Sequence, residues 1–232
     1  MAKKEGIRKL FDNIAGDYDR LNHILSLNID KSWRKKAVRE IADSAEPVNI
    51  LDEACGTCDF TIEIAKAAPK DSKVTGIDLS ERMLQIGRDK CSKEGITAEL
   101  QTGDCEAMPY EDETFDRIGV AFGVRNFENL PKGLTEMLRV LKPGGKLVIL
   151  ELSRPRNPII RWGYKLYFLK IIPAIGGCVS GNRSAYEYLP SSVLRFPAPE
   201  KFMEMMQEAG FEQVRKKSFT MGICHMYLGI KK

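Results

Sequence analysis

The stretch LDEACGTCDF (residues 51–60) decides between two different folds for this chain. Cys55 and Cys58 form a C-x-x-C pair, which is the spacing of zinc knuckles and dithiol redox sites. The same residues also have the pattern of a buried strand, a turn of small residues and the start of a helix. Sites for nucleotide-type cofactors are often built in that way. The two interpretations imply different proteins, and the rest of the chain distinguishes them.

The cysteine pattern gives little support to a metal site. The six cysteines are scattered, at positions 55, 58, 91, 105, 178 and 224. A structural zinc site needs four ligands, but there is no second C-x-x-C, and His23 and His225 are far from the pair in sequence. The opening MAKKEGIRKL lacks the apolar core of a signal peptide, so we expect reduced thiols and a cytoplasmic location. We therefore expect no metal, and we expect both histidines to be structural.

The bulk properties predict a single globular domain. A length of 232 residues suits one α/β domain with a full core. Apolar residues make up 43% and charged residues 29%. A net charge of +4 is too small to indicate a nucleic-acid partner. We expect no membrane span, because no apolar run reaches about 18 residues.

Strand and helix patterns alternate along the chain. Apolar segments rich in β-branched residues predict strands at 48–54, 73–79, 97–104, 117–123, 146–152, 213–219 and 222–230. Apolar helical faces occur at residues 33–41, 134–141 and 202–209, and Ser80 is placed to cap a helix over 80–94. KPGG at 142–145 is expected to end the helix that carries the face at 134–141. Strands separated by helices indicate an α/β fold with a parallel sheet.

The turn after the first predicted strand differs from a dinucleotide site. A dinucleotide fold has G-x-G-x-x-G there, with backbone N–H groups around a pyrophosphate. Gly56 is the only glycine in this turn, and Asp52, Glu53 and Asp59 surround it. Carboxylates are poor partners for a phosphate but good partners for a cation. S-adenosylmethionine carries a sulfonium and an ammonium group and no phosphate, so it fits this turn better than a nicotinamide dinucleotide.

Acidic side chains also end the next two predicted strands. At Asp78 a carboxylate can accept from both ribose hydroxyls, and at Asp104 one can accept from the adenine amino group. Each acid has a plainer explanation, with Asp52, Asp59 or Asp78 as a helix cap and Asp104 as a turn residue. Those explanations do not account for all of them falling at one edge of the sheet. We therefore expect a cofactor site at this edge.

The order of these motifs resembles that of class I S-adenosylmethionine-dependent methyltransferases. Two stretches narrow the resemblance to the ubiquinone/menaquinone biosynthesis C-methyltransferases: YDRLNHILSLNIDKSW (18–33) and RVLKPGGKLVILELS (139–153). AFGVRNFENL (121–130) is similar to the segment that follows the family's fourth strand. In the first stretch Leu21 replaces the family's methionine and Asp30 replaces its histidine. The resemblance extends from about residue 11 to the C-terminus.

The resemblance implies a Rossmann-like fold, with helices on both faces of a mostly parallel sheet of seven strands whose last strand is antiparallel. It implies S-adenosyl-L-methionine as methyl donor and no metal. The cofactor-binding residues expected from it and from the acidic edge are Asp52, Gly56, Thr57, Asp78, Asp104 and Cys105. Cys55 and Cys58 stand where the family's G-G-T-G turn has glycines. At position 58 a Cβ lies where glycine lets the backbone approach the cofactor.

The implied reaction is methyl transfer from sulfur to a ring carbon of a polyprenyl quinol, converting demethylmenaquinol to menaquinol. The same step on a ubiquinol precursor is one alternative, and a non-catalytic cofactor-binding scaffold of a quinone-synthesis complex is another. A deprotonated ring hydroxyl increases electron density on the ortho carbon. We therefore expect the substrate to be the quinol, and we expect a group that removes the phenolic proton.

The candidate catalytic residues are Arg125, Asn126 and Asp104. Arg125 is expected to stabilise the phenolate or to hold a water that takes the proton, because arginine itself is almost never deprotonated. Asn126 is expected to orient the ring oxygen. The alternatives are a structural ion pair between Arg125 and Glu128 and a helix cap at Asn126.

Tyr18 and Trp162 are the candidate substrate-binding residues. Tyr18 belongs to an N-terminal helical segment, about 1–45, that is expected to cover the site as a lid; packing alone is the alternative. Trp162 belongs to an insertion, about 154–190, that is rich in aromatic and basic residues. This insertion is expected to admit the lipid quinol and to contact an anionic membrane at its inner face. A capping helix or a dimer contact is the alternative for the insertion.

Overall fold

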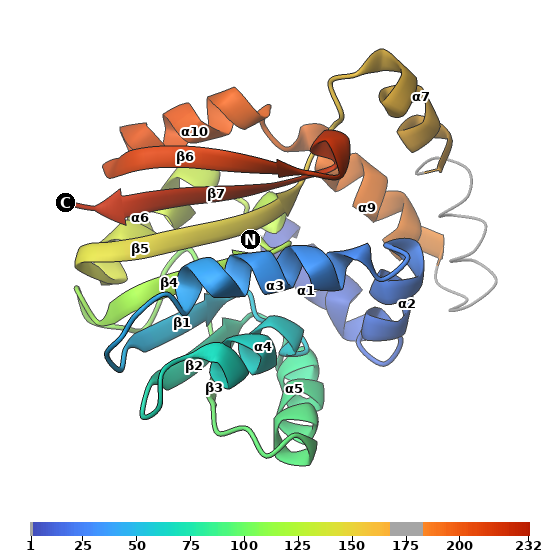
Figure 1. The fold of residues 1–232 in the computed structure, drawn as a ribbon. Helices are drawn as coiled ribbons and strands as arrows, with labels where there is room; N and C mark the ends of the chain where they lie inside the picture. The colour runs from blue at the N-terminus through green and yellow to red at the C-terminus, as the bar shows by residue number, and fades with distance from the viewer. Residues whose placement is uncertain (1, 168–182) are drawn as a thin grey trace.

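One sheet of seven strands forms the centre of the molecule (Figure 1). The computed structural model describes residues 2–167 and 183–232. In chain order the strands are β1 (Asn49–Glu53), β2 (Lys73–Asp78), β3 (Glu99–Thr102), β4 (Phe115–Ala121), β5 (Leu141–Leu152), β6 (Phe211–Phe219) and β7 (Cys224–Lys231). Across the sheet their order is β3-β2-β1-β4-β5-β7-β6, and β7 is antiparallel to both neighbours. The seven predicted strands and the antiparallel last strand are confirmed.

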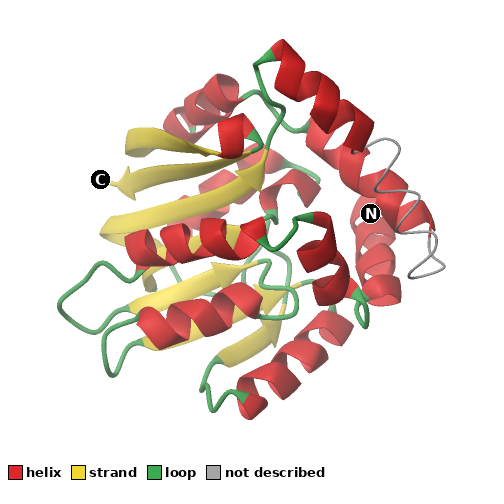
Figure 2. Ribbon diagram, turned by 45° about the vertical axis from the view of Figure 1, so that its right-hand side comes forward, coloured by secondary structure: helices red, strands yellow, loops and turns green. Residues whose placement is uncertain are grey.

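Helices cover both faces of this sheet, as the Rossmann-like expectation requires (Figure 2). The described helices are α1 (Ala2–Ile14), α2 (Tyr18–Leu25), α3 (Ile29–Ile41), α4 (Asp59–Ala67), α5 (Glu81–Lys93), α6 (Leu130–Val140), α7 (Pro158–Leu166), α9 (Arg183–Arg195) and α10 (Pro199–Glu208). Two short 3-10 helices are η1 (Val124–Asn126) and η3 (Thr220–Gly222). No described helix is long and apolar enough to cross a membrane.

Two hydrophobic cores, one on each face, attach these helices to the sheet. Adjacent strand residues point to opposite faces, and accordingly Leu51 belongs to one core and Ile50 to the other. The first core takes its helical side chains from α6 and α10, and the second takes them from α3 and α4. Burying each large apolar side chain contributes about 1.5–3 kcal/mol. The apolar faces predicted at 33–41, 134–141 and 202–209 are the ones that the sheet covers.

Local signals fix most of the helix ends. Ser80 caps α5, because its hydroxyl oxygen accepts a hydrogen bond from the Met83 backbone N–H at 3.1 Å. Asn129 caps α6 in the same way. The KPGG at 142–145 lies within β5 instead of forming a separate turn. There the pairing with β4 jumps from Leu141 to Lys146, which makes β5 longer than predicted.

Helices α1 and α2 and the insertion lie at the carboxyl ends of the parallel strands (Figure 1). Helix α3 packs on the sheet through Trp33, Ala37 and Ile41. The expected insertion contains α7 and α9, while residues 168–182 lie outside the described part of the chain. The strand order reverses between β1 and β4. A crevice at that point is where open α/β sheets bind their ligands.

Candidate functional site

The turn between β1 and α4 contains three residues in the left-handed backbone region. Ala54, Gly56 and Cys58 have φ values of 55°, 55° and 66°, so a glycine is favoured at position 58 on conformational grounds. The Cys58 side chain is fully buried, and its sulfur would overlap a Cβ placed on Gly87 of α5. Cys55 similarly occupies space beside Gly76 of β2, where a Cβ would lie 2.9 Å from the Cys55 sulfur. The two cysteines therefore fill space that neighbouring glycines provide.

The surroundings of the Cys55 and Cys91 thiols disfavour their ionisation. A hydrogen bond to Cys58 and burial raise the pKa of Cys55 well above its ordinary value. Burial raises the pKa of the neighbouring Cys91 to about 11. Metal ligation and thiol exchange both need a thiolate. Within residues 2–167 and 183–232, no group of three or more His, Cys, Asp or Glu side chains is placed to hold a metal ion.

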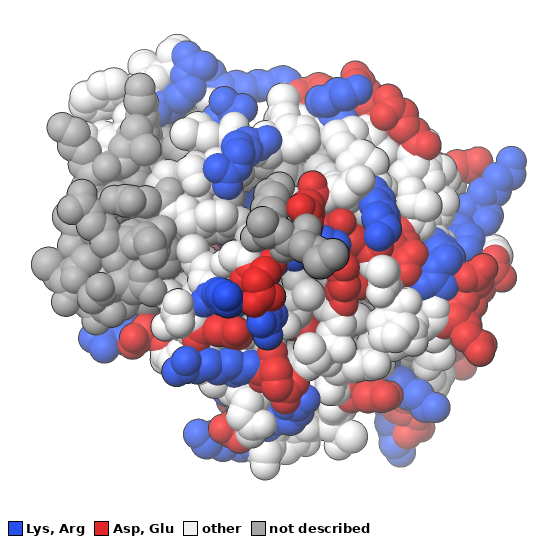
Figure 3. Space-filling view, turned by 180° about the vertical axis from the view of Figure 1, so that it is seen from behind, with Lys and Arg blue, Asp and Glu red and all other residues white. Residues whose placement is uncertain are grey.

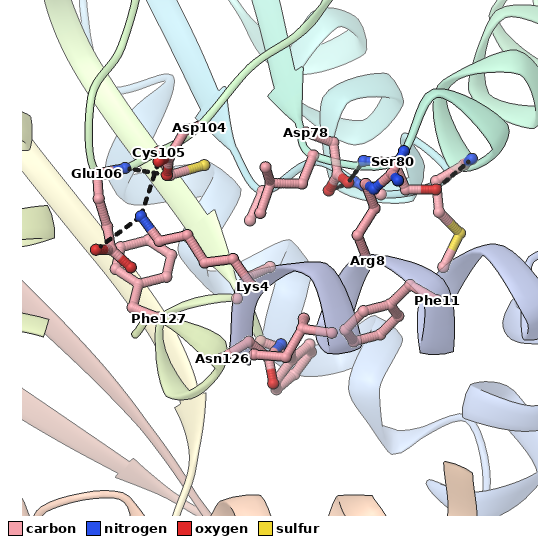
Figure 4. Close-up of a pocket in the computed structure, with 18 of the residues that line it drawn as sticks. Lys4, Arg8, Phe11, Asp78, Ser80, Asp104, Cys105, Glu106, Asn126 and Phe127 are labelled. Carbon is pink, nitrogen blue, oxygen red and sulfur yellow. Dashed lines mark hydrogen bonds and ion pairs between the residues drawn. The ribbon is translucent and has the colours of Figure 1, made fainter. Parts of the chain in front are cut away.

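Asp78 links the turn to the end of β2. Its Oδ2 accepts the Gly56 backbone N–H at 2.9 Å, and its Oδ1 accepts the Ser80 N–H at 2.8 Å. Burial raises the pKa of this carboxyl. Gly56, Asp78, Asp104 and Cys105 together line one pocket at the strand ends, hereafter the cofactor pocket (Figure 4). Four of the six predicted cofactor-binding residues therefore share one cavity wall.

The other two predicted cofactor residues lie behind this wall. Thr57 is buried, and its hydroxyl donates to Asp19 at the start of α2. Asp52 is 1% exposed and accepts the Thr61 hydroxyl at 2.5 Å. Burial raises the pKa of Asp52 to about 7, and it raises that of the fully buried Glu53 well above its ordinary value. These two acids support the turn from the interior, so the turn is less anionic than its sequence suggests.

Asp59, the third acid of the predicted anionic turn, is paired with cations from distant segments. Arg34 of α3 lies 3.2 Å from its Oδ2, and Lys90 of α5 donates to its Oδ1. Although burial opposes the change, these cations lower the pKa of Asp59. The local sequence contains few cations near this turn, but folding brings them from elsewhere.

Helix α1, which belongs to the N-terminal segment expected to cover the site, closes the cofactor pocket from the opposite side through contacts that the sequence did not indicate. The Lys4 Nζ lies 2.7 Å from Asp104 Oδ2 and 3.0 Å from Glu106 Oε2 (Figure 4). Arg8 and Phe11 of the same helix also line the pocket. The remaining free volume is about 80 Å³, whereas ligand pockets usually measure about 300–1,000 Å³. The α1 side chains therefore occupy space that a cofactor would need.

A second cavity of about 470 Å³, hereafter the apolar cavity, adjoins the first. Its apolar lining comes from α3, α7, β5 and the loops near η3, and includes Leu27, Ile29, Trp33, Leu152, Ile160 and Ile223. Tyr18 and Phe122 line both cavities. An OH-bearing ring and an apolar ring therefore stand where the two cavities meet. Tyr18, one of the two predicted substrate residues, lies at this junction.

Arg125 and Asn126 of η1 face different cavities. Arg125 lines the apolar cavity, and its Nη1 lies 2.9 Å from Oε1 of the fully buried Glu151. Asn126 lines the cofactor pocket, and its Oδ1 accepts the Tyr188 hydroxyl at 2.9 Å. The alternative ion pair to Glu128 is wrong, because the partner is Glu151. The alternative helix cap is also wrong, because Asn129 caps α6.

The remaining predicted residues have varied environments. Trp162 is 71% exposed on α7 and does not line the apolar cavity, although Gly163 and Tyr164 beside it do. Burial lowers the pKa of His225 in β7 to about 4. Basic and acidic side chains are interspersed on the face seen in Figure 3. That face offers no broad basic surface for a nucleic acid.

Comparisons with known proteins agree on a family. The profile of the ubiE/COQ5 methyltransferase family matches residues 1–231. The ubiquinone/menaquinone biosynthesis C-methyltransferase UbiE of Geobacter sulfurreducens is 44% identical, over 99% of this chain and 90% of its own. The demethylmenaquinone methyltransferase of Bacteroides fragilis is 43% identical, over 99% of this chain and 94% of its own.

Solved structures share the fold at much lower identity. A SAM-dependent methyltransferase from Thermotoga maritima, described as a possible histamine N-methyltransferase, has a TM-score of 0.66 at 22% identity, covering 97% of this chain and 99% of its own. The [4+2]-cyclase SpnF has a TM-score of 0.72 at 17% identity, covering 99% of this chain and 97% of its own. At such identities the likeness concerns the fold alone.

Proposed function

The chain belongs to the ubiE/COQ5 methyltransferase family, and we propose that it transfers the methyl group of S-adenosyl-L-methionine to a ring carbon of a polyprenyl quinol. The observation that carries this proposal is the junction of two unlike cavities at Tyr18 and Phe122. A polar pocket at the strand ends suits the cofactor. The large apolar cavity beside it suits a lipid-linked ring.

In this proposal the strand-end acids hold the cofactor. Asp78 accepts from the ribose hydroxyls, and Asp104 accepts from the adenine amino group once Lys4 releases it. Gly56 and Cys105 complete the wall. Thr57 and Asp52 act indirectly, by fixing the turn from behind. Because α1 fills the pocket, this helix has to shift to admit the cofactor, which supports the proposed lid role for the α1 part of the N-terminal segment of about 1–45.

Arg125 is proposed to stabilise the phenolate in the apolar cavity. S-adenosylmethionine supplies an activated methyl group, so the remaining task is to hold the ring and increase its electron density. Glu151 fixes the orientation of Arg125, while the buried Arg125 Nε has no hydrogen-bond partner in the described part of the chain. Asn126, one residue along on the cofactor side, is proposed to orient the ring oxygen. Asp104 lies in the cofactor pocket, so it is proposed to bind the cofactor and not the quinol ring.

The mouth of the apolar cavity is proposed to lie against a membrane. Leu27, Ile159, Trp162 and Met221 are 72%, 79%, 71% and 75% exposed. Leu27 lines the cavity, and each of the other three is next in sequence to a lining residue. Exposed apolar side chains of this kind enter the interface of a bilayer, and the exposed Arg161 on α7 suits anionic lipid. Trp162 would then contact lipid at the inner face of the membrane, rather than the quinol ring.

We propose demethylmenaquinol as the substrate. Two proteins that are 43% and 41% identical to this chain, from Bacteroides fragilis and Staphylococcus saprophyticus, bear the name demethylmenaquinone methyltransferase. The test incubates the protein with cofactor carrying a labelled methyl group and with each reduced quinone precursor in vesicles. Mass spectrometry is expected to find label in menaquinol. Label in the ubiquinone product alone would change the substrate, and label in neither would leave a non-catalytic scaffold.

A further inference from the structure

Asp30 is the only carboxylate in the wall of the apolar cavity among the described residues. It lies in the first turn of α3 and is 4% exposed. The other titratable groups of the described wall are two arginines and three tyrosines, namely Arg34, Arg125, Tyr18, Tyr164 and Tyr167. An arginine does not act as a base, and burial raises the pKa of each of these tyrosines. Asp30 is therefore the side chain of this described wall whose carboxylate oxygens are placed to accept a proton.

Asp30 retains one free acceptor site. An ionised carboxylate has about four lone-pair sites. Ser26 donates its hydroxyl to Oδ1 at 2.5 Å, while Arg34 Nη1 and His23 Nδ1 lie 2.7 and 3.1 Å from Oδ2. At least one site, on Oδ1, therefore remains in either tautomer of His23. Arg34 shares its positive charge among three carboxylates, because the guanidinium that contacts Asp30 also lies 3.2 Å from Asp59 and 3.4 Å from Glu63.

His23 connects Asp30 to a second, outer cleft. Its Nδ1 faces Asp30, and its Nε2 lies 3.4 Å from Asp59 Oδ2. His23, Asp59 and Lys90 line a cleft of about 270 Å³ whose described wall shares only Arg34 with that of the apolar cavity. His23 and Asp59 are 22% and 27% exposed. Asp30, His23 and Asp59 thus form a path from a buried carboxylate to solvent.

We propose that Asp30 takes the ring-hydroxyl proton of the bound quinol and that His23 passes this proton to the outer cleft. The inference rests on the proposed function. The O–H bond breaks, its electron pair enters the ring, the ring carbon forms the bond to the methyl group, and the sulfur keeps the pair of the broken S–C bond. The ring hydrogen then moves from carbon to oxygen, which restores aromaticity. One proton leaves in total.

That proton follows the line of close contacts outward. The protonated carboxyl of Asp30 turns to present the proton to Nδ1 of the His23 tautomer that carries its hydrogen on Nε2. The Nε2 proton then passes to Asp59, which releases it to water, and proton exchange of the imidazole with solvent restores the starting tautomer. Imidazole suits this role because it can take a proton on one nitrogen and release one from the other. The charged groups around the path are Arg34 of α3, Asp59 and Glu63 of α4, Lys90 of α5 and Asp19 of α2.

The test compares three variants in the quinol methylation assay across pH. Asp30→Asn keeps the size of the side chain and removes the acceptor, so kcat at pH 7 is expected to fall about 10²-fold, as for the loss of a general base. The KM values for cofactor and quinol should stay near those of the wild type. The variant's rate should then rise with pH as the quinol ionises unaided. His23→Gln is expected to show the same pH-dependent recovery after a smaller loss.

Glu63→Gln is the matched control, because it removes a carboxylate from the same arginine, while Glu63 lies outside the wall of the apolar cavity and forms no ion pair with His23 in the described part of the chain. It is expected to keep wild-type kcat and pH dependence. Wild-type kcat in Asp30→Asn, or an equal loss in Glu63→Gln, would overturn the relay. If Asp30→Asn does not fold, the test rests on His23→Gln. A decrease in kcat for that variant that stays the same at every pH would count against the path. Absence of methylation by the wild type would instead refute the proposed function.

Discussion

Replacing Asp78 by alanine tests the assignment of the cofactor pocket most directly. The Asp78 carboxylate uses one site on each oxygen to accept the backbone N–H groups of Gly56 and Ser80. About two of its four lone-pair sites therefore remain for the two ribose hydroxyls. Asp78→Ala removes both of those bonds and also releases Gly56, which positions the turn. We expect cofactor affinity to collapse while the fold is retained.

The size of the loss follows from the two missing bonds. A hydrogen bond to a charged group contributes about 1.5–3 kcal/mol, so two such bonds contribute about 3–6 kcal/mol. That corresponds to a decrease in affinity of about 10²- to 10⁴-fold. Asp78→Asn keeps one acceptor oxygen, and its loss should lie between those of the wild type and Asp78→Ala.

Isothermal titration calorimetry with S-adenosylmethionine measures this loss, and circular dichroism checks the fold. Asp116→Ala is a suitable control, because Asp116 of β4 also accepts a backbone N–H, from Asn49 at 2.8 Å, but at the start of β1, away from the pocket. That variant should bind the cofactor with wild-type affinity. Unchanged affinity in Asp78→Ala, or an equal loss in Asp116→Ala, would refute the assignment.

Three further changes test the surroundings of the pocket. Burial raises the pKa of Asp52 to about 7, so between about pH 4 and 7 the folded chain holds a proton that the unfolded chain has lost. The contribution of Asp52 to stability should fall by about 4 kcal/mol as pH rises through this window, and Asp52→Asn should remove that part of the slope in urea unfolding. Glu53 and Asp78, whose pKa values burial also raises, should keep their own part. Gly87→Ala should lower the free energy of unfolding by about 1–3 kcal/mol, because its Cβ overlaps the Cys58 sulfur. Adding Cys58→Gly to that variant should restore most of the lost free energy without loss of cofactor binding. Lys4→Ala should tighten cofactor binding about fivefold in calorimetry, by freeing Asp104 from an ion pair worth about 1 kcal/mol.

Each of these three expectations has a clear contrary result. A pH slope that is undiminished in Asp52→Asn would assign it entirely to the other buried carboxyls. Additive losses in the Gly87 and Cys58 double variant would show that the two side chains do not compete for space, and loss of a bound metal or of activity on Cys58→Gly would return the C-x-x-C pair to a metal or redox role. Weaker cofactor binding in Lys4→Ala would mean that Lys4 helps to hold the cofactor.

The sheet was predictable because its signals are local. Each strand is a short apolar segment, and the carboxyl ends of parallel strands necessarily share an edge. Gly56, Asp78 and Asp104 could therefore be assigned to one site from sequence alone. Helix ends followed for the same reason, as at Ser80, where the capping side chain lies within three residues of its donor.

The electrostatics of the site were less predictable because they depend on distant contacts. The acidic residues around the β1–α4 turn indicated an anionic site, yet Asp52 is buried against Thr61, and Asp59 pairs with Arg34 and Lys90. Lys4, one hundred residues from Asp104, binds it directly. No periodicity or spacing in the sequence encodes such pairs. The same applies to the partner of Arg125, which is Glu151 on β5 and not the nearby Glu128.

The function of this chain depends more on its apolar cavity than on its sheet. A cyclase shares the fold with a TM-score of 0.72, so the fold does not by itself determine the reaction. The apolar cavity, in contrast, combines a fixed cation at Arg125, an acceptor at Asp30 and an apolar mouth at the surface. Such a cavity suits a lipid-linked ring that must lose a proton. Cofactor binding alone would therefore not distinguish an enzyme from a scaffold, whereas the pH dependence of quinol methylation in Asp30→Asn would.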